Sequence, residues 1–155
     1  MEKIKWTANE MPKTEDKYLP LMSKEKIEKA LAFHKSFPQY SETPLAELNH
    51  MAAYLGLNDF FVKDESYRFG LNAFKVLGGS FAMANYIAEK LKKDVLELTY
   101  DELTSDQLRS AFGQATFFTA TDGNHGRGVA WAANKLGQKS VVLLSLIHIS
   151  ESTRP

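Results

Sequence analysis

The sequence contains no cysteine among its 155 residues. Disulfide bonds, thiolate zinc sites and a cysteine nucleophile are therefore excluded for this chain. Net charge is lacking as well, because 19 lysines and arginines balance 19 aspartates and glutamates. A balanced chain has no long-range field that would attract nucleic acid or an anionic membrane, so neither is an expected partner. The four histidines do not pair at the spacing of helical metal ligands, and no metal site is expected.

Long apolar runs are also missing, and no segment is long enough to cross a bilayer. The charged segment from Met1 to Glu10 lacks the apolar stretch of a secretory signal, so we expect a cytoplasmic protein. Hydrophobic residues make up 44% of the chain and aromatic residues 12%, which is enough for one globular core.

Helical signals come first along the chain. Apolar residues at a 3.6-residue period predict a helix that Ser23 caps and that ends before Pro38. Thr43 and Pro44 predict the start of a second helix, because proline at the first helical position loses no hydrogen bond. Gly56 would end it. Its expected buried stripe consists of Leu45, Leu48, Ala52 and Leu55.

The middle of the chain predicts a strand and a longer helix. Aromatic and β-branched residues favour a strand over Asp59–Lys63. A third helix is expected to begin after Asn72, which is a good cap, and to run toward Lys93. Gly78 and Gly79 fall inside it, each costing about 1 kcal/mol relative to alanine, which indicates a close packing partner or ligand there.

The C-terminal third predicts a helix followed by a strand, a glycine-rich turn, a helix and a second strand. The expected bounds are Tyr100–Phe112, Thr116–Thr121, Asp122–Gly128, Val129–Leu136 and Ser140–Leu144. The last four form a βαβ unit, which implies a parallel sheet with helices on its faces and an α/β fold. Ser145–Pro155 (SLIHISESTRP) is similar to a translated sequencing-adaptor tail and is not expected to belong to the fold.

Two stretches carry the chemistry, and the first is Lys63–Gly79 (KDESYRFGLNAFKVLGG). It places Lys75 early in a helix that follows a polar loop. Most helical lysines are solvated surface residues. Phe74 and Val76 flank Lys75 closely, however, and a desolvated lysine has a lowered pKa and becomes an amine nucleophile for a Schiff base. The spacing alone leaves both interpretations open.

The second stretch is Thr121–Gly128 (TDGNHGRG), between a strand and a helix. Backbone N–H groups at a helix start are unpaired and can hold a carboxylate or phosphate. An ordinary glycine-rich turn capped by Asn124 would explain the same pattern. His125 and Arg127 gain no catalytic role from the pattern, because such residues beside a turn are more often structural or solvated.

Together the two stretches resemble the fold-type-II pyridoxal-phosphate (PLP) dependent enzymes, the tryptophan synthase β-like family. In that family a lysine in an N-x-F-K or S-F-K setting forms the Schiff base, and a later S/T-x-G-N-H loop binds the substrate carboxylate. Phe74-Lys75 and Thr121–His125 match both motifs in that order. The combination of KDES-x-RFGLNAFK with ATDGNHGRGVAWAA is similar to the diaminopropionate ammonia-lyases, because generic members usually have a small residue in place of Asp122.

This resemblance implies PLP as cofactor and an α,β-elimination that converts 2,3-diaminopropionate, a small amino-acid substrate, to pyruvate and ammonia. It implies that Lys75 holds the cofactor and is the base for the L-substrate, whereas Asp122 takes the proton from the D-isomer. The Asn124 side chain would contact the cofactor's ring oxygen. The implied ligands of the substrate carboxylate are Thr121, Gly123, Asn124 and His125.

The resemblance also implies a domain plan. Residues 1–90 would open the large PLP-binding domain, 91–144 would begin the small domain, and 145–155 would be a non-native tail. The phosphate-binding glycine loop and the partner of the pyridine nitrogen are expected beyond Leu144. We therefore expect no activity for the 155-residue chain by itself. The resemblance further implies a homodimer for the full-length enzyme.

Two other functions remain open. A threonine or serine dehydratase would use the same cofactor, although Asp122 and the RFGLNAFK stretch argue against it. A noncatalytic, anion-binding βαβ module would need no cofactor, and Lys75 would then be only a surface charge.

Overall fold

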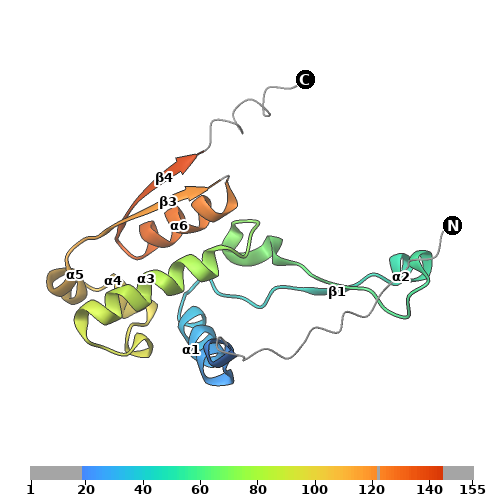
Figure 1. Cartoon of the computed structure of the whole chain (residues 1–155), viewed down its shortest axis with the longest axis horizontal. Coiled ribbons are helices and arrows are strands. Elements are labelled where there is room, and N and C mark those ends of the chain that lie inside the picture. The colour runs from blue at the N-terminus through green and yellow to red at the C-terminus, as the bar shows by residue number, and fades with distance from the viewer. Residues whose placement is uncertain (1–18, 122, 145–155) are drawn as a thin grey trace.

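The computed structural model describes residues 19–121 and 123–144 (Figure 1). Residues 1–18, Asp122 and the expected tail, 145–155, lie outside the described residues. After a short 3-10 turn (Leu19–Met22), helix α1 runs over Lys24–Lys35. Ser23 caps α1 as predicted, because its hydroxyl oxygen accepts a hydrogen bond from the Lys26 N–H at 3.4 Å.

The predicted second helix is wrong at its start. Leu45–Glu47 forms strand β1, which pairs antiparallel with β2 (Phe61–Lys63), and helix α2 covers only Asn49–Leu55. The expected buried stripe is wrong for Leu45 and Leu48, which are 65% and 37% exposed, and confirmed for Ala52, which is buried. Pairing with the predicted and confirmed strand β2 overrides the helix-start signal of Thr43 and Pro44. Gly56 ends α2 as predicted, in the left-handed conformation with φ 68°.

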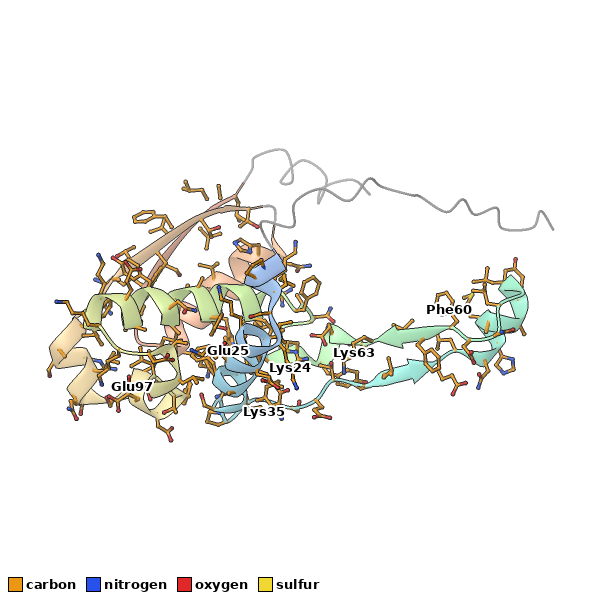
Figure 2. The ribbon with its side chains drawn as sticks, turned by 60° about the horizontal axis from the view of Figure 1, so that its bottom comes forward. Lys24, Glu25, Lys35, Phe60, Lys63 and Glu97 are labelled. Atoms are coloured by element: carbon orange, nitrogen blue, oxygen red, sulfur yellow. The ribbon has the colours of Figure 1, made fainter. Side chains whose placement is uncertain are left out.

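Strands β1 and β2 and helix α2 form an arm, residues 45–63, that extends away from the rest of the molecule (Figure 1). Figure 2 places Lys63 near the base of this arm and Phe60 near its outer end. At the base, the buried Arg68 guanidinium donates to the Glu65 carboxylate and, at 3.1 Å, to the Ser41 carbonyl. Thr43 and Lys63 add further hydrogen bonds, so the base of the arm is tied to the loop before α3.

Helix α3 (Val76–Leu91) crosses the middle of the structure. It is followed by a 3-10 turn (Val95–Glu97) with a capping box and by helices α4 (Tyr100–Thr104) and α5 (Asp106–Phe112). Helical structure over Tyr100–Phe112 is therefore confirmed, with a break at Ser105. The break is local, because the Ser105 hydroxyl oxygen caps α5 by accepting from the Leu108 N–H at 3.1 Å.

The predicted βαβ unit is confirmed. Strand β3 (Thr116–Thr121) pairs in parallel with β4 (Lys139–Leu144), and helix α6 (Asn124–Lys135) connects them. Helix α6 begins at Asn124 rather than at the predicted Val129, so the second half of the glycine-rich motif is helical. The parallel register pairs Thr121 with Leu144, which puts the carboxyl ends of both strands at one edge.

The core lies where α3 packs between α1 and α6, and Figure 1 shows these two helices on opposite sides of α3. Aromatic rings join the layers, since Phe37 and Phe69 both lie against Trp131 of α6. The largest fully buried side chains are Ile87, Leu98, Leu136 and Val76.

The expected domain boundary near residue 90 falls at the end of α3. This division into domains stays a prediction.

Candidate active site

Lys75 lies at the start of α3, as its N-cap residue. The predicted third helix is confirmed as α3, but it begins at Val76 and not directly after Asn72. Asn72 is not its cap, because it adopts a left-handed turn conformation with φ 57°. Two residues of the preceding loop, Phe69 and Gly70, also have positive φ, so the chain turns sharply before it reaches Lys75. Lys75 is exposed. The described residues therefore do not bury its side chain, as a desolvated lysine would require.

Helix α6 passes directly over the Lys75–Val76 peptide at Gly128. A Cβ atom added to Gly128 would lie 2.8 Å from the Val76 nitrogen and 3.1 Å from the Lys75 carbonyl carbon. Such distances are shorter than van der Waals contact, so only glycine permits this approach. Gly79 has a partner too, because a Cβ there would lie 3.5 Å from a Val129 methyl group. The close packing partner predicted for the glycine pair is therefore confirmed at Gly79, whereas Gly78 has open space.

This contact brings the two sequence motifs together. Asn124 precedes Gly128 by four residues and lies on the same face of α6, about 6 Å along the helix axis. The first turn of α6 is therefore close to the backbone of Lys75. Both also lie at the carboxyl edge of the parallel strands, which is where α/β proteins bind ligands. Sequence reasoning missed this role of Gly128, although its four-residue spacing from Asn124 was a usable signal.

Backbone N–H groups converge at the start of α6. The Thr121 hydroxyl oxygen accepts from the N–H groups of Gly123 at 3.2 Å and Gly126 at 3.3 Å. These two hydrogen bonds fold the loop onto the end of β3 and fix where α6 starts, and the backbone N–H groups of a helix's first turn are donors of the kind that hold a carboxylate. The close approach again requires glycine, because a Cβ on Gly126 would lie 2.5 Å from the Thr121 methyl group.

The remaining predicted residues have different positions. Asn124 is exposed at the first position of α6, beside the converging N–H groups. His125 is exposed as well, and it lines a groove of about 500 Å³ together with Gly79 and Phe117. Asp122 lies outside the described residues, so its role stays a prediction.

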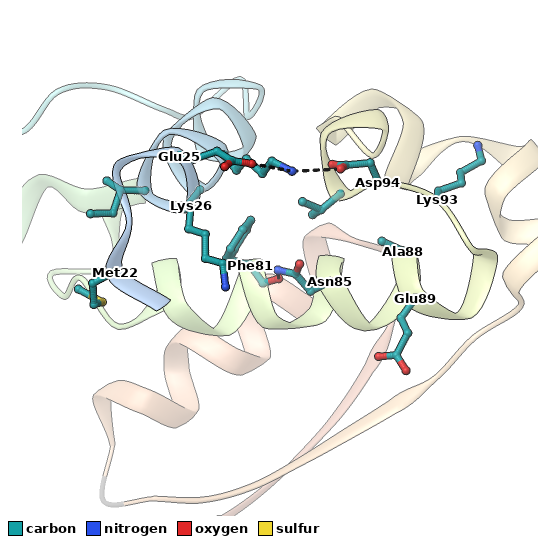
Figure 3. Close-up of a pocket in the computed structure, with 13 residues that line it drawn as sticks. Met22, Glu25, Lys26, Phe81, Asn85, Ala88, Glu89, Lys93 and Asp94 are labelled. Carbon is teal, nitrogen blue, oxygen red and sulfur yellow. Dashed lines mark hydrogen bonds and ion pairs between the residues drawn. The ribbon is translucent and has the colours of Figure 1, made fainter. Parts of the chain in front are cut away.

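A larger cavity, of about 690 Å³, lies between α1 and α3 (Figure 3). Its lining includes Phe81 and Asn85, and Lys29 is held between Glu25 and Asp94 at its edge (Figure 3). It shares no lining residue with the groove beside His125. The largest cavity is therefore separate from both sequence motifs.

Two kinds of feature are absent from the part of the chain that the structure describes. Within residues 19–121 and 123–144, no cluster of three or more histidine, cysteine, aspartate or glutamate residues is arranged to hold a metal ion. Over the same residues, no helix has the length and apolar character needed to cross a membrane.

A lysine amine at a helix start, close to the amide-rich start of a second helix in a βαβ unit, is the arrangement that the sequence led us to expect for a fold-type-II enzyme. The chain belongs to the pyridoxal-phosphate dependent enzyme family, whose model matches residues 37–152. The expected tryptophan synthase β-like α/β fold is thereby confirmed, and PLP is the cofactor of this family.

Individual relatives narrow the match. The chain is 53% identical to the diaminopropionate ammonia-lyase of Salmonella typhimurium over 114 residues, which is 74% of this chain and 28% of that protein. It is 46% identical to the enzyme of the same name from Escherichia coli K12 over 126 residues, or 81% of this chain and 30% of that protein. The crystal structure of the Escherichia coli diaminopropionate ammonia lyase in apo form matches with a TM-score of 0.72 and 47% identity, over 79% of this chain and 32% of that chain. The chain thus spans less than a third of the length of these relatives.

The described residues fit part of a PLP site. Lys75 offers an exposed amine for the cofactor's aldehyde, and the Asn124 side chain offers an amide donor for an oxygen atom. The backbone N–H groups at the start of α6 are donors of the kind that a substrate carboxylate needs.

Proposed function

We propose that the whole protein uses PLP to eliminate ammonia from 2,3-diaminopropionate, and that pyruvate and a second ammonia are the final products. The observation that carries this proposal is the approach of Gly128 to the Lys75–Val76 peptide, which puts the backbone of Lys75 next to the helix that begins with the Asn124 motif. Identities of 53% and 46% to two diaminopropionate ammonia-lyases support the choice of substrate.

Lys75 has two roles in this proposal. Its amine would hold the cofactor through the aldehyde group, and when free it would accept the proton from the α-carbon of the L-substrate. When bound, PLP supplies an electron sink for the negative charge that develops at this carbon. Lys75 has room for both roles because it is exposed at the start of α3 rather than packed in the core.

The start of α6 would orient the substrate and the cofactor. The carboxylate would accept hydrogen bonds from the backbone N–H groups of the loop, and the partial positive charge of the helix start favours such an anion. The Asn124 side chain would donate to the ring oxygen of the cofactor. In this proposal the residues around the carboxylate are Thr121, Gly123, Asn124 and His125.

Asp122 would be the base for the D-isomer. The two isomers present their α-protons to opposite faces of the cofactor plane, so a second base is needed on the face away from Lys75. Asp122 follows β3 directly and precedes the carboxylate-binding loop in the sequence. This position supports a role next to the α-carbon.

We also propose that the whole protein is a cytoplasmic homodimer. Support for association comes from apolar side chains exposed along the arm, including Leu45 at 65% and Phe61 at 54%. Sedimentation of the whole protein at micromolar concentration would test the stoichiometry, and a monomer would contradict it. Cell fractionation would test the location.

The central experiment compares Lys75→Ala with Lys92→Ala in the whole protein. Lys92 is an exposed lysine at the other end of α3, so it controls for the loss of a charge from the same helix. We expect Lys75→Ala to lose the visible absorption of bound cofactor, covalent trapping of PLP by borohydride, and at least about a thousandfold in pyruvate release. Lys92→Ala should retain all three.

Unchanged absorption in Lys75→Ala would exclude Lys75 as the cofactor lysine. The substrate assignment is checked with the same assay on serine, threonine and both isomers of diaminopropionate. Faster turnover of serine or threonine would favour a dehydratase instead. Asp122→Asn should lose activity mainly on the D-isomer, and equal losses on both isomers would mean that Asp122 is not a face-specific base.

A further inference from the structure

The first turn of α3 is only weakly held by hydrogen bonds within the helix. Its N-cap residue, Lys75, makes no side-chain capping hydrogen bond, and the Gly79 N–H reaches the Lys75 carbonyl only at 3.4 Å. Gly78 and Gly79 further weaken this turn, by about 1 kcal/mol each relative to alanine. Contacts with other elements must therefore hold the turn that carries Lys75.

Helix α6 supplies one such contact through Gly128, and α1 supplies the other through His34. The His34 ring is 6% exposed and packs edge-on against Phe33 of its own helix. Its Nε2 atom lies 3.0 Å from the Leu77 carbonyl oxygen and 3.1 Å from the Ser80 hydroxyl oxygen. Ser80 is fully buried, and its hydroxyl is also within hydrogen-bonding distance of the Leu77 carbonyl, at 3.2 Å.

The other ring nitrogen determines how this group is used. His34 Nδ1 lies 2.7 Å from the Ala30 carbonyl oxygen, which can only accept, so Nδ1 carries the proton. In the neutral ring Nε2 is then an acceptor, and the Ser80 hydroxyl donates to it. The Leu77 carbonyl oxygen can only accept, so in this tautomer it is a neighbour of Nε2 and not its hydrogen-bond partner. Burial lowers the pKa of His34, and the charge of Arg68 adds to this effect, while the carbonyls of Ala30 and Leu77 oppose it.

The surroundings of the ring are otherwise apolar. His34 shares a cavity of about 360 Å³ with Tyr40 and Arg68, which are the titratable or charged side chains on its lining. The Arg68 guanidinium donates to Glu65, Ser41 and Thr43. The hydrogen bond of the His34 ring to another element thus goes to Ser80, in the second turn of α3.

We propose that His34 is a positioning residue for Lys75: through its hydrogen bond with Ser80 it ties α1 to the N-terminal part of α3 and so sets where the Lys75 amine lies. The inference rests on the function proposed for Lys75. His34 lies before residue 37, where the match to the family model begins, so the inference is argued from the contacts of His34 alone.

The test uses His34→Leu, which fills the buried position with an apolar side chain and removes both ring nitrogens. The rescue variant is His34→Gln, whose amide places a donor and an acceptor near the position of Nε2. The matched control is Ser36→Ala. The Ser36 hydroxyl oxygen accepts from the Tyr100 N–H at 2.9 Å, so it ties the end of α1 to α4 and not to α3.

The main readout is the rate at which PLP and borohydride label Lys75 in the whole protein, divided by the rate for Lys92 and measured by peptide mass spectrometry. Displacement of a reacting group by about 1 Å can cost up to about a hundredfold in rate. We therefore expect His34→Leu to lower the ratio by about tenfold or more, with a loss in kcat rather than in KM. His34→Gln should recover most of the ratio, and Ser36→Ala should leave it unchanged.

A wild-type ratio in folded His34→Leu would overturn this inference and leave the proposed function standing. Wild-type protein that is labelled no faster at Lys75 than at Lys92 would overturn the proposed function and this inference with it. If His34→Leu does not fold, Ser80→Ala replaces it, because that variant removes only the hydroxyl. A wild-type labelling ratio in Ser80→Ala would then contradict the proposed positioning of Lys75 by His34.

Discussion

Glu65 and Arg68 form an ion pair at the base of the arm, where the Glu65 side chain is 22% exposed and the Arg68 side chain is 9% exposed. The Arg68 hydrogen bond lowers the pKa of the Glu65 carboxyl below its ordinary value of 4.5, and the Thr43 hydroxyl adds to this effect. The same pair raises the pKa of Arg68. Charge at Glu65 therefore stabilises the folded state.

The pH dependence of stability follows from this shift. A carboxyl whose pKa is lowered on folding contributes stability above its unfolded pKa and loses it as pH falls through the folded pKa. We expect wild type to exceed Glu65→Gln in free energy of unfolding at pH 6 to 7. The difference should shrink as the pH is lowered below about 4.5, the unfolded value.

Urea unfolding of both proteins between pH 3 and 7 measures this difference, and other titrating groups cancel in the comparison. Glu89→Gln, on an exposed face of α3, is a suitable control because its carboxyl has no ion pair among the described residues. A difference that grows toward low pH would contradict the assigned sign.

Individual residues were unequally predictable from the sequence. Lys75 and Asn124 stand in long motifs with a fixed local spacing, so the sequence alone pointed to them. His34 had no such signal, because its role depends on contacts with Leu77 and Ser80, 43 and 46 positions away. A lone histidine in an amphipathic helix has the same local pattern whether or not it contacts a functional helix.

At the scale of elements, the contact between α3 and α6 depends on glycine. Gly128→Ala would place a methyl group 2.8 Å from the Val76 nitrogen and 2.9 Å from its Cα, and backbone atoms cannot rotate away. We expect the helices to separate at this point, with a loss of about 1 to 3 kcal/mol in stability. Trapping of PLP at Lys75 should fall with it.

Gly78→Ala is the matched control for the Gly128 prediction, since a Cβ at Gly78 meets nothing within 4 Å. Alanine is preferred to glycine inside a helix by about 1 kcal/mol, so this variant should be as stable as wild type or more so. Chemical unfolding gives the order of the three proteins. Equal stability of Gly128→Ala and wild type would mean that the two helices do not approach each other this closely.

Elements were predictable where local pattern and tertiary structure agree. The βαβ unit combines alternating strands with a glycine-rich turn, and its structure follows that pattern. The stretch after Thr43 and Pro44 differs, because its backbone can start a helix or enter a strand. The partner strand Phe61–Lys63 decides for the strand, and no local signal contains that pairing.

At the scale of the whole molecule, the described chain leaves apolar surface uncovered. Helix α6 packs against β3 and β4, while Phe118 is 72% exposed and Leu143 is 61% exposed on the same strands. A two-stranded sheet is only marginally stable without further strands or a covered face. These side chains are therefore available to further structure, and the relatives are more than three times as long as the matched segment.

The last prediction concerns the 155-residue chain expressed as it stands. We expect it to release added PLP on dialysis and to form no ammonia from diaminopropionate. Its described residues provide the Lys75 amine and the amides at the start of α6, which serve the cofactor's aldehyde and the substrate's carboxylate. The cofactor's phosphate needs several hydrogen bonds of about 1.5 to 3 kcal/mol each, and losing even three of them weakens binding by several powers of ten. Covalent attachment through an amine is reversible and does not replace them.

The measurement is a PLP titration followed by dialysis and an ammonia assay, with Lys75→Ala as the control for nonspecific labelling. Retention of one PLP per chain in wild type but not in the control, together with turnover, would place the phosphate site within these residues.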